Sequence, residues 1–159
     1  MGLGDVYKRQ IDVFTPSPNS TCGNIALSLA DADGNLSLYT DGLFLYDNQH
    51  NTTPNGRDLN SRSDGANSIV FIPDYLNLDE HYIFYLTLLG NLTYSVVDMS
   101  LNNGLGDIRP GQKNITITPN ILYSYIDVFI DNCDNAWILA KEQNSRNIHF
   151  IQLLSLIHI

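Results

Sequence analysis

The chain has 159 residues, 43% hydrophobic and 16% charged, a balance that excludes an intrinsically disordered chain and fits a single domain. Seventeen acidic residues against eight basic ones give a net charge of −9 at pH 7. This charge argues against nucleic-acid and anionic-membrane partners, because both require a basic face. No apolar run reaches the roughly 18 residues that a membrane helix needs, so we expect no membrane insertion.

Both ends of the chain resemble translated adapter sequence of the kind found at the ends of reading frames from assembled metagenomic DNA. The segments are residues 1–10, which contain GLGDVYKRQ, and residues 154–159, LSLIHI. We therefore expect two non-native ends around a natural core of residues 11–153, with both true termini missing. The alternative is a short natural arm and a real final strand. Two cysteines, Cys22 and Cys133, are too few for a disulfide framework, and whether they pair stays open.

The acidity is almost entirely aspartate, with fifteen Asp and only two Glu, and the chain also has eighteen Asn and eleven Gly. Asp, Asn and Gly tolerate positive φ and bond their own backbone, so they mark turns and disfavour helices. The segments between them are rich in Tyr, Phe, Ile, Leu and Thr, which favour strands. The composition predicts an all-β protein whose acidic side chains form a solvated rim of turns.

In chain order, the pattern predicts strands separated by short turns and two long loops. An Asp-Gly pair between strand-like runs, as at Asp41-Gly42, is the strongest short hairpin signal. The predicted loops are residues 47–67 and 100–113. The predicted strands are residues 25–30, 36–40, 43–46, 68–72, 81–89, 92–99, 114–118, 121–130, 136–141 and 148–153.

These strands fall into three clusters that recur about every 45 to 55 residues, which is the range of β-propeller blades. Turns are short within a cluster and long between clusters. We therefore predict an incomplete β-propeller of about three blade-like antiparallel meanders, with a β-sandwich as the alternative. Three blades cannot close a ring, since propellers use roughly four to eight. The rest of the propeller is then missing, and blade faces should be exposed.

Two segments carry a resemblance to a known family. The run from Asp31 to Gly56, which ends in Pro54-Asn55-Gly56, and the run LTYSVVDMSLNNGLGDI from Leu92 to Ile108 resemble the N-terminal propeller of gliding-motility-associated surface proteins exported by the type IX secretion system. The resemblance covers roughly residues 20–153 and rests on turn motifs. The third cluster keeps Trp137 but lacks the basic or His-containing strand that the family usually has before it.

The resemblance implies a secreted or cell-surface bacterial protein that acts as a non-catalytic interaction or adhesion module, with a surface protein or a glycan as partner. Variable loops of a propeller usually carry binding, and here these would include residues 47–67 and 100–113. The alternative function is a fragment of an extracellular glycan-acting hydrolase. Its paired carboxylates would be sought in residues such as Asp79 and Glu80, although a solvated turn explains these two residues better.

One turn has the residue types of a cation site. Asp31, Asp33 and Asn35 surround Gly34, and calcium prefers closely spaced carboxylate and amide oxygens. The acid that a D-x-D-x-D-G loop needs is replaced by Leu29. The alternative is a plain hairpin turn in which the aspartates bond their own backbone. We expect no catalytic residue and no cofactor apart from calcium at this turn.

The aromatic residues also have two interpretations. Trp137 and the tyrosine-rich strands favour packing within and between blades, and an aromatic sugar-binding platform is the alternative. The tyrosines concerned are Tyr82, Tyr85, Tyr94, Tyr123 and Tyr125.

Overall fold

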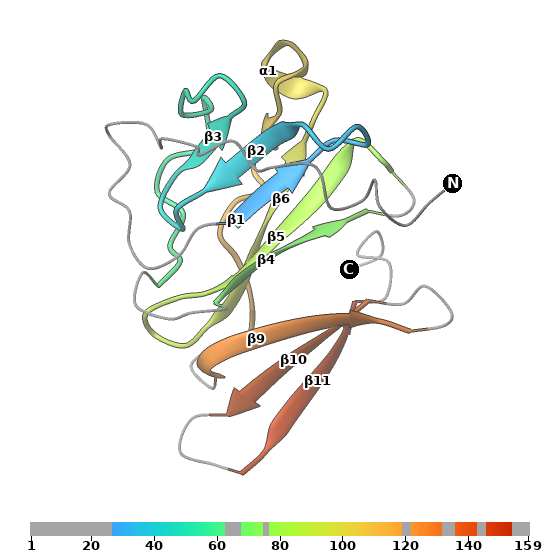
Figure 1. Ribbon diagram of the computed structural model, residues 1–159. Coiled ribbons are helices and arrows are strands. Elements are labelled where there is room, and N and C mark those ends of the chain that lie inside the picture. Colours follow the sequence, from blue (N-terminus) through green and yellow to red (C-terminus); the bar gives the residue numbers. More distant parts are fainter. Residues whose placement is uncertain are drawn as a thin grey trace, which may run out of the picture.

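In the computed structural model the chain is an all-β protein made of three antiparallel sheets (Figure 1). The structure describes residues 27–62, 68–74, 77–118, 122–131, 136–142 and 146–153. The predicted non-native ends, Cys22 and Cys133 lie outside these residues. Within the described part, no helix is long and apolar enough to cross a membrane.

The three sheets follow one another along the chain. The first has the order β1-β2-β3, the second has the order β4-β5-β6-β7 with β8 also paired to β6, and the third has the order β11-β10-β9. The first sheet consists of β1 (Leu27–Ala30), β2 (Leu36–Thr40) and β3 (Leu45–Asp47). The second consists of β4 (Ile69–Pro73), β5 (Glu80–Leu86), β6 (Leu92–Asp98), β7 (Asp107–Ile108) and β8 (Ile115–Thr118). The third consists of β9 (Leu122–Ile130), β10 (Ala136–Glu142) and β11 (Ile148–Leu153).

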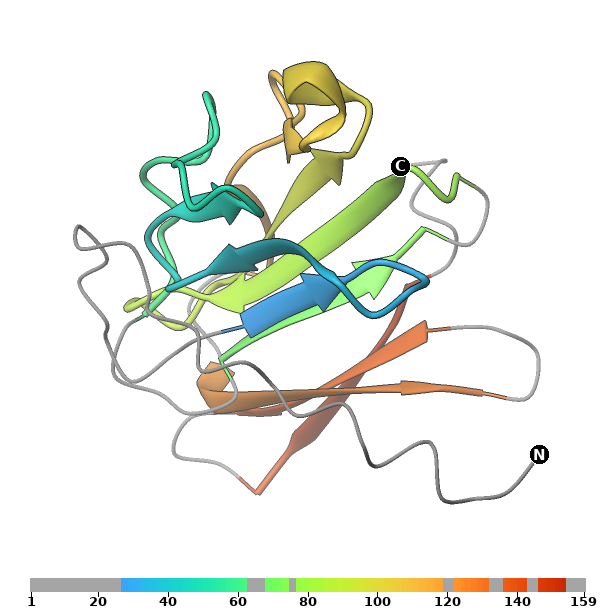
Figure 2. The same cartoon turned by 45° about the horizontal axis from the view of Figure 1, so that its top comes forward.

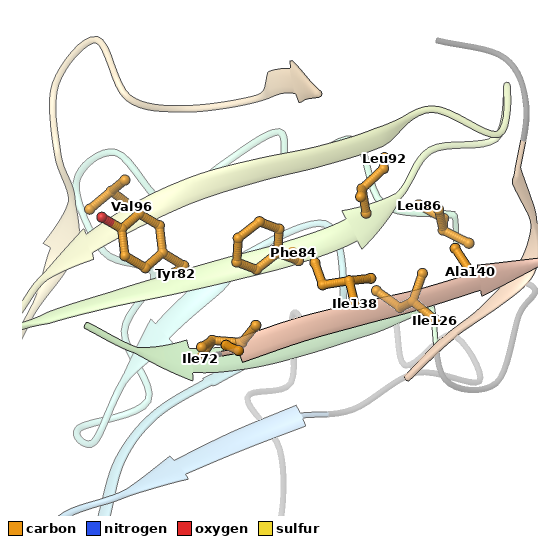
Figure 3. Close-up of a cluster of buried hydrophobic side chains, with 10 residues drawn as sticks. Ile72, Tyr82, Phe84, Leu86, Leu92, Val96, Ile126, Ile138 and Ala140 are labelled. Carbon is orange, nitrogen blue, oxygen red and sulfur yellow. The ribbon is translucent and has the colours of Figure 1, made fainter. Parts of the chain in front are cut away.

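The sheets pack face to face with the second sheet in the middle (Figures 1 and 2). One core cluster joins the first and second sheets, and a separate cluster joins the second and third sheets (Figure 3). The first cluster contains Leu38, Leu45, Leu59, Ile69, Ile83, Tyr85, Val97 and Ile108. The second contains Ile72, Tyr82, Phe84, Leu86, Leu92, Val96, Ile126, Ala136, Ile138 and Ala140.

Strand β5 shows why the middle sheet needs both neighbours. Ile83 and Tyr85 point into the cluster shared with the first sheet, whereas Phe84 and Leu86 point into the cluster shared with the third. All four side chains are buried. A strand places successive side chains on opposite faces, so this hydrophobic run leaves β5 without a solvent face and requires apolar surface on both sides.

The strand predictions are confirmed in position, and their ends differ from the observed ones by at most three residues. One assignment is wrong: residues 114–118 do not belong to the third cluster, because β8 pairs with β6 and thus extends the second sheet. The predicted loop 100–113 contains two short elements, α1 (Leu101–Gly104) and β7. The all-β class is confirmed, and the described residues do not form a closed propeller or barrel.

The double burial of β5 leads to a stability prediction. The Phe84→Ala variant removes a fully buried ring and should lower the free energy of unfolding by about 3–5 kcal/mol in a urea titration. Leu89 is 74% exposed, so the Leu89→Ala control should change it by less than about 0.5 kcal/mol. Equal, small effects of both substitutions would contradict the packing described above.

Candidate functional site: a surface formed by two loops

The first loop, residues 47–62, folds back against the strand that precedes it. The Leu45 N–H donates to the Gly56 carbonyl at 2.7 Å, and the Leu59 N–H donates to the Leu43 carbonyl at 2.9 Å. Leu59 is buried in the core between the first two sheets. Gly56 lies so close to this strand that a Cβ atom there would be 2.7 Å from the Leu45 carbonyl oxygen. The loop is therefore held along its length by backbone bonds and one apolar anchor.

The second loop, residues 100–114, begins with a left-handed turn. In α1, Asn102 has φ 52° and ψ 44°, and Asn103 has φ 58° and ψ 34°. Two consecutive non-glycine residues in this region are uncommon, because the Cβ atom then approaches the following carbonyl. Further along, the loop runs beside β6, where the Val96 N–H donates to the Gln112 carbonyl and the Arg109 N–H donates to the Val96 carbonyl.

The non-glycine residues with a left-handed backbone in the described part of the chain are concentrated in these two loops. Every non-glycine residue there with positive φ belongs to one loop or the other. Such residues persist only where surrounding contacts hold them, and they are concentrated at functional sites. The residues are His50 and Asp58 in the first loop and Asn102, Asn103 and Asn114 in the second.

The two loops are joined by a carboxylate. One oxygen of Asp107 accepts the backbone N–H of Asn55 at 2.9 Å, and the other accepts the Asn55 side-chain amide at 2.7 Å. Asp107 is only 3% exposed and also accepts the Ile108 N–H at 2.8 Å. These bonds connect residues 52 positions apart in the sequence, and the loops lie next to each other at one end of the molecule (Figures 1 and 2). We call residues 47–62 and 100–114 together the loop surface.

Two residues near the end of the second loop strengthen this connection. Lys113 donates its Nζ to the carbonyls of Asn55 and Arg57, at 3.3 and 2.5 Å. The Asn114 side-chain amide donates to the Asp58 carbonyl at 3.0 Å, while its Oδ1 accepts the hydroxyl of Tyr85. Burial raises the pKa of Tyr85 to about 12, so this hydroxyl stays a neutral donor. The loop surface is thereby attached to the central strand β5.

A cluster of three charged side chains connects the second loop to strands β5 and β6. Arg109 pairs through Nη2 with Glu80 at the start of β5 and with Asp98 at the end of β6, the latter at 3.0 Å. Asn77 also donates its side-chain amide to Glu80, at 2.6 Å. The Ser100 hydroxyl donates to the Asp98 carboxylate at 2.6 Å. This bond and the nearby Arg109 guanidinium lower the pKa of Asp98. Both carboxylates therefore hold the base of the loop.

The loop surface is also where basic residues gather in an acidic chain. Of the eight basic residues in the sequence, four lie in these two loops, and the side chain of Arg57 is exposed. This concentration was visible in the sequence and could have pointed to the loops more strongly than their length did. The four are Arg57, Arg62, Arg109 and Lys113.

The predicted calcium turn has the contacts of a hairpin turn. One Asp31 oxygen accepts the backbone N–H groups of Asp33 and Asn35, at 3.0 and 2.8 Å, and the other accepts the Asn35 side-chain amide at 3.1 Å. These bonds lower the pKa of Asp31. Within the described residues, no three His, Cys, Asp or Glu side chains are grouped so that they could hold a metal ion. Calcium binding by Asp31, Asp33 and Asn35 stays a prediction.

The predictions for the acidic residues are confirmed at some positions and wrong at others. Aspartates do form the turns: Asp41 and Asp47 each accept two backbone N–H groups that follow them in the chain. Both are buried, as is Glu80, so the expectation of a solvated acidic rim is wrong at these positions. The prediction that Asp79 and Glu80 lie in a solvated turn is wrong for Glu80, which begins β5. Its neighbour Asp79 is exposed.

The predicted role of the aromatic residues in packing is confirmed for part of the set. Tyr82 and Tyr85 are buried in the two core clusters, and Tyr94 packs against one of them. Trp137 is half-buried and Tyr125 is 54% exposed. The side chain of Tyr123 lies outside the described part of the chain.

No family model, curated protein or solved structure matches this chain. The functional argument therefore rests on the geometry of the loops and on the motifs within them.

The Asp107 connection should be measurable as loop stability. The Asp107→Ala variant leaves the Asn55 amide groups without their acceptor, and we expect a loss of about 1–3 kcal/mol in the free energy of unfolding. Hydrogen exchange of residues 47–62 should become faster in the same variant. The exposed Asp79→Ala control should change neither quantity. Unchanged exchange in the first loop of Asp107→Ala would show that the two loops are not coupled.

The ion cluster predicts a particular acid dependence. Because the pKa of Asp98 lies below its ordinary value of 3.8 in the folded state, its carboxylate adds stability that is complete well above pH 3.8 and is lost as the pH falls through the lowered value. Urea midpoints measured from about pH 5 to about pH 2 should therefore fall less steeply for Asp98→Asn than for the unmodified chain. Asp79→Asn is the control and should follow the unmodified chain. Parallel curves for all three proteins would contradict this role of Asp98.

Proposed function

We propose that this chain is a non-catalytic interaction or adhesion module of a secreted or cell-surface bacterial protein. It binds its partner through the loop surface. We further propose that its three sheets are consecutive blades of an incomplete β-propeller. The observation that carries the proposal is the pair of loops interlocked by the Asn55–Asp107 hydrogen bonds. Ordering a flexible loop on binding costs conformational entropy and so weakens affinity. A surface whose loops are already ordered avoids this cost.

The stacked arrangement supports the propeller part of the proposal. Each sheet is an antiparallel meander, and the second and third sheets each pack one face on the sheet before them in the chain. Blades of a propeller are meanders that follow one another in this way. A β-sandwich has two sheets, whereas here the middle sheet is covered on both faces.

The motifs of the resemblance support the link to gliding motility and type IX secretion. The first motif ends with Asn55 and Gly56, and the second ends with Asp107 and Ile108. These are the same segments that the Asn55–Asp107 hydrogen bonds join. The similarity thus concerns residues that build the loop surface, and we infer a comparable surface and a comparable extracellular setting.

The chemistry of the loop surface suits a polar ligand. Its exposed residues include Arg57, Asn60 and Asn103, which supply a cation and amide groups. Its buried carboxylate Asp107 is bonded to Asn55, and the nearby Glu80 and Asp98 are bonded to Arg109. Sugar hydroxyls and the polar groups of surface proteins are ligands that such amides and a guanidinium can bind. The carboxylates hold the loops in place, which favours binding over hydrolysis.

A binding experiment tests this function. The complete chain is applied to a panel of immobilised bacterial surface polysaccharides and surface proteins, and retention is measured together with the release of reducing sugars. We expect retention without release. The Arg57→Ala and Asn60→Ala variants should each bind about 3- to 10-fold more weakly, because each loses one or two polar contacts.

The control is Arg146→Ala, which removes an exposed arginine from the turn before β11 and should leave retention unchanged. Release of reducing sugars would favour the glycan-acting hydrolase instead. Retention that is equal in all variants would place binding outside the loop surface.

A further inference from the structure

The turn between β5 and β6 presents two adjacent leucines to solvent. Leu88 and Leu89 are 71% and 74% exposed. They occupy the two central positions of a turn that the Gly90 N–H closes by donating to the Thr87 carbonyl at 2.9 Å. Sequences favour Pro, Gly, Asp, Asn and Ser in turns, because these residues suit the backbone geometry or bond to their own backbone. Leucine has neither property, so the turn itself does not account for the pair.

The turn is held in one conformation. The Thr87 N–H donates to the Asn91 carbonyl at 3.0 Å, and the Asn91 N–H donates to the Thr87 hydroxyl oxygen at 3.1 Å. Gly90 has φ 76°, a left-handed value that glycine adopts without strain. We call residues 87–91 the leucine tip. Because its backbone is already fixed, little conformational freedom is lost when another surface covers its two leucines.

The missing part of the proposed propeller does not explain why the leucine tip is exposed. Strands β5 and β6 belong to the middle sheet, whose two faces are packed against the first and third sheets. Further blades would pack on the outer face of the first or the third sheet. The leucine tip lies instead at the end of the β5–β6 hairpin, where the two strands connect (Figure 1). Its exposure therefore belongs to the middle sheet itself.

The leucine tip adjoins the first loop of the loop surface. Ser61 and Thr87 form an antiparallel β-bridge, and the Arg62 N–H donates to the Leu86 carbonyl at 2.8 Å. Asn60, which is exposed and belongs to the loop surface, directly precedes the bridge. The polar groups of the first loop and the apolar tip are thus neighbouring parts of one surface.

We propose that the leucine tip determines the class of ligand: the partner of the loop surface is a protein that receives Leu88 and Leu89 in an apolar pocket. This inference rests on the proposed function. Leucine gains free energy when apolar groups of a partner remove water from it, and a polysaccharide covered with hydroxyl groups offers few such groups. Protein interfaces combine an apolar centre with a polar rim, which is the combination that the tip and the first loop provide.

Charge indicates what surrounds the pocket and argues against a membrane. The leucine tip contains no charged residue, whereas the chain as a whole has a net charge of −9. Such a chain repels acidic surfaces, so the rim of the pocket should be neutral or basic. Surfaces that bind membranes combine a large apolar area with attraction to anionic lipids. Two leucines in an acidic chain provide neither, and the tip therefore fits a protein better than a lipid surface.

Retention of the complete chain on three separate sets of probes tests the inference. The probes are purified bacterial surface proteins, purified surface polysaccharides and phosphatidylcholine vesicles. We expect retention on a surface protein, and we expect Leu88→Ser and Leu89→Ser each to weaken it about 10-fold or more, because each removes a side chain that the partner buries. Arg57→Ala should weaken binding to the same protein, since the first loop contacts the same partner.

The matched control is Leu78→Ser. Leu78 is 79% exposed but precedes β5, whereas the leucine tip follows it, so the two sites lie at opposite ends of this strand. The control should be retained like the unmodified chain. Circular dichroism and the urea midpoint should be the same for all three leucine variants, which checks that each of them folds.

Four results would overturn the inference. Retention on polysaccharides alone would overturn the protein partner and leave the proposed function standing. A surface protein that binds Leu88→Ser and Leu89→Ser as tightly as the unmodified chain would show that the tip is not part of the contact. Binding to the vesicles that both variants lose would make the tip a membrane contact. Absence of retention on every probe would overturn the proposed function and this inference with it.

Discussion

The fold depends on the double burial of the middle sheet. Strand β5 alternates Tyr82, Phe84 and Leu86 on one side with Ile83 and Tyr85 on the other, and none of these five side chains reaches solvent to a significant degree. Burying a large apolar side chain contributes roughly 1.5–3 kcal/mol. The middle sheet can therefore gain this free energy only if a sheet covers each face. The first and third sheets are those covers, and their positions follow from this requirement.

The same strand connects the core to the loop surface. Tyr85 packs in the core between the first and second sheets, and its hydroxyl reaches Asn114 at the end of the second loop. Asn114 in turn bonds Asp58 in the first loop. Left-handed residues are costly to maintain, and here rigid strands below and cross-loop hydrogen bonds between Asn55 and Asp107 maintain them. The rigidity of the loop surface is thus derived from the stack beneath it.

Much of the fold could be predicted from the sequence because its signals are local. Asp41-Gly42 marks a turn, and the strands on either side show the expected residue types. The assignment of residues 114–118 failed because strand propensity does not specify a partner, and β8 finds β6 about twenty residues earlier in the chain. The bond between Asn55 and Asp107 joins positions too distant for any short-range pattern to reveal. Alternation also does not tell which side of a sheet will be covered, so Tyr85 and Tyr125 look alike in the sequence although one is buried and the other exposed.

The candidate site was predictable as a pair of long polar loops, but not as one surface. Its carboxylates illustrate the limit, since an aspartate in a polar loop looks the same whether it faces water or, like Asp107, is buried and bonded to another loop. The available signal was the grouping of basic residues in the two loops. The sequence has only eight basic residues, and half of them lie in these two segments.

The most direct test of the central claim is whether the three sheets unfold together. Hydrogen exchange followed by mass spectrometry along a urea titration can report separately on peptides from β2, β5 and β10. If the middle sheet requires both neighbours, all three peptides lose protection at the same urea concentration. Loss of protection in β10 at clearly lower urea, with β5 still protected, would show that the middle sheet is stable without the third and would contradict this account.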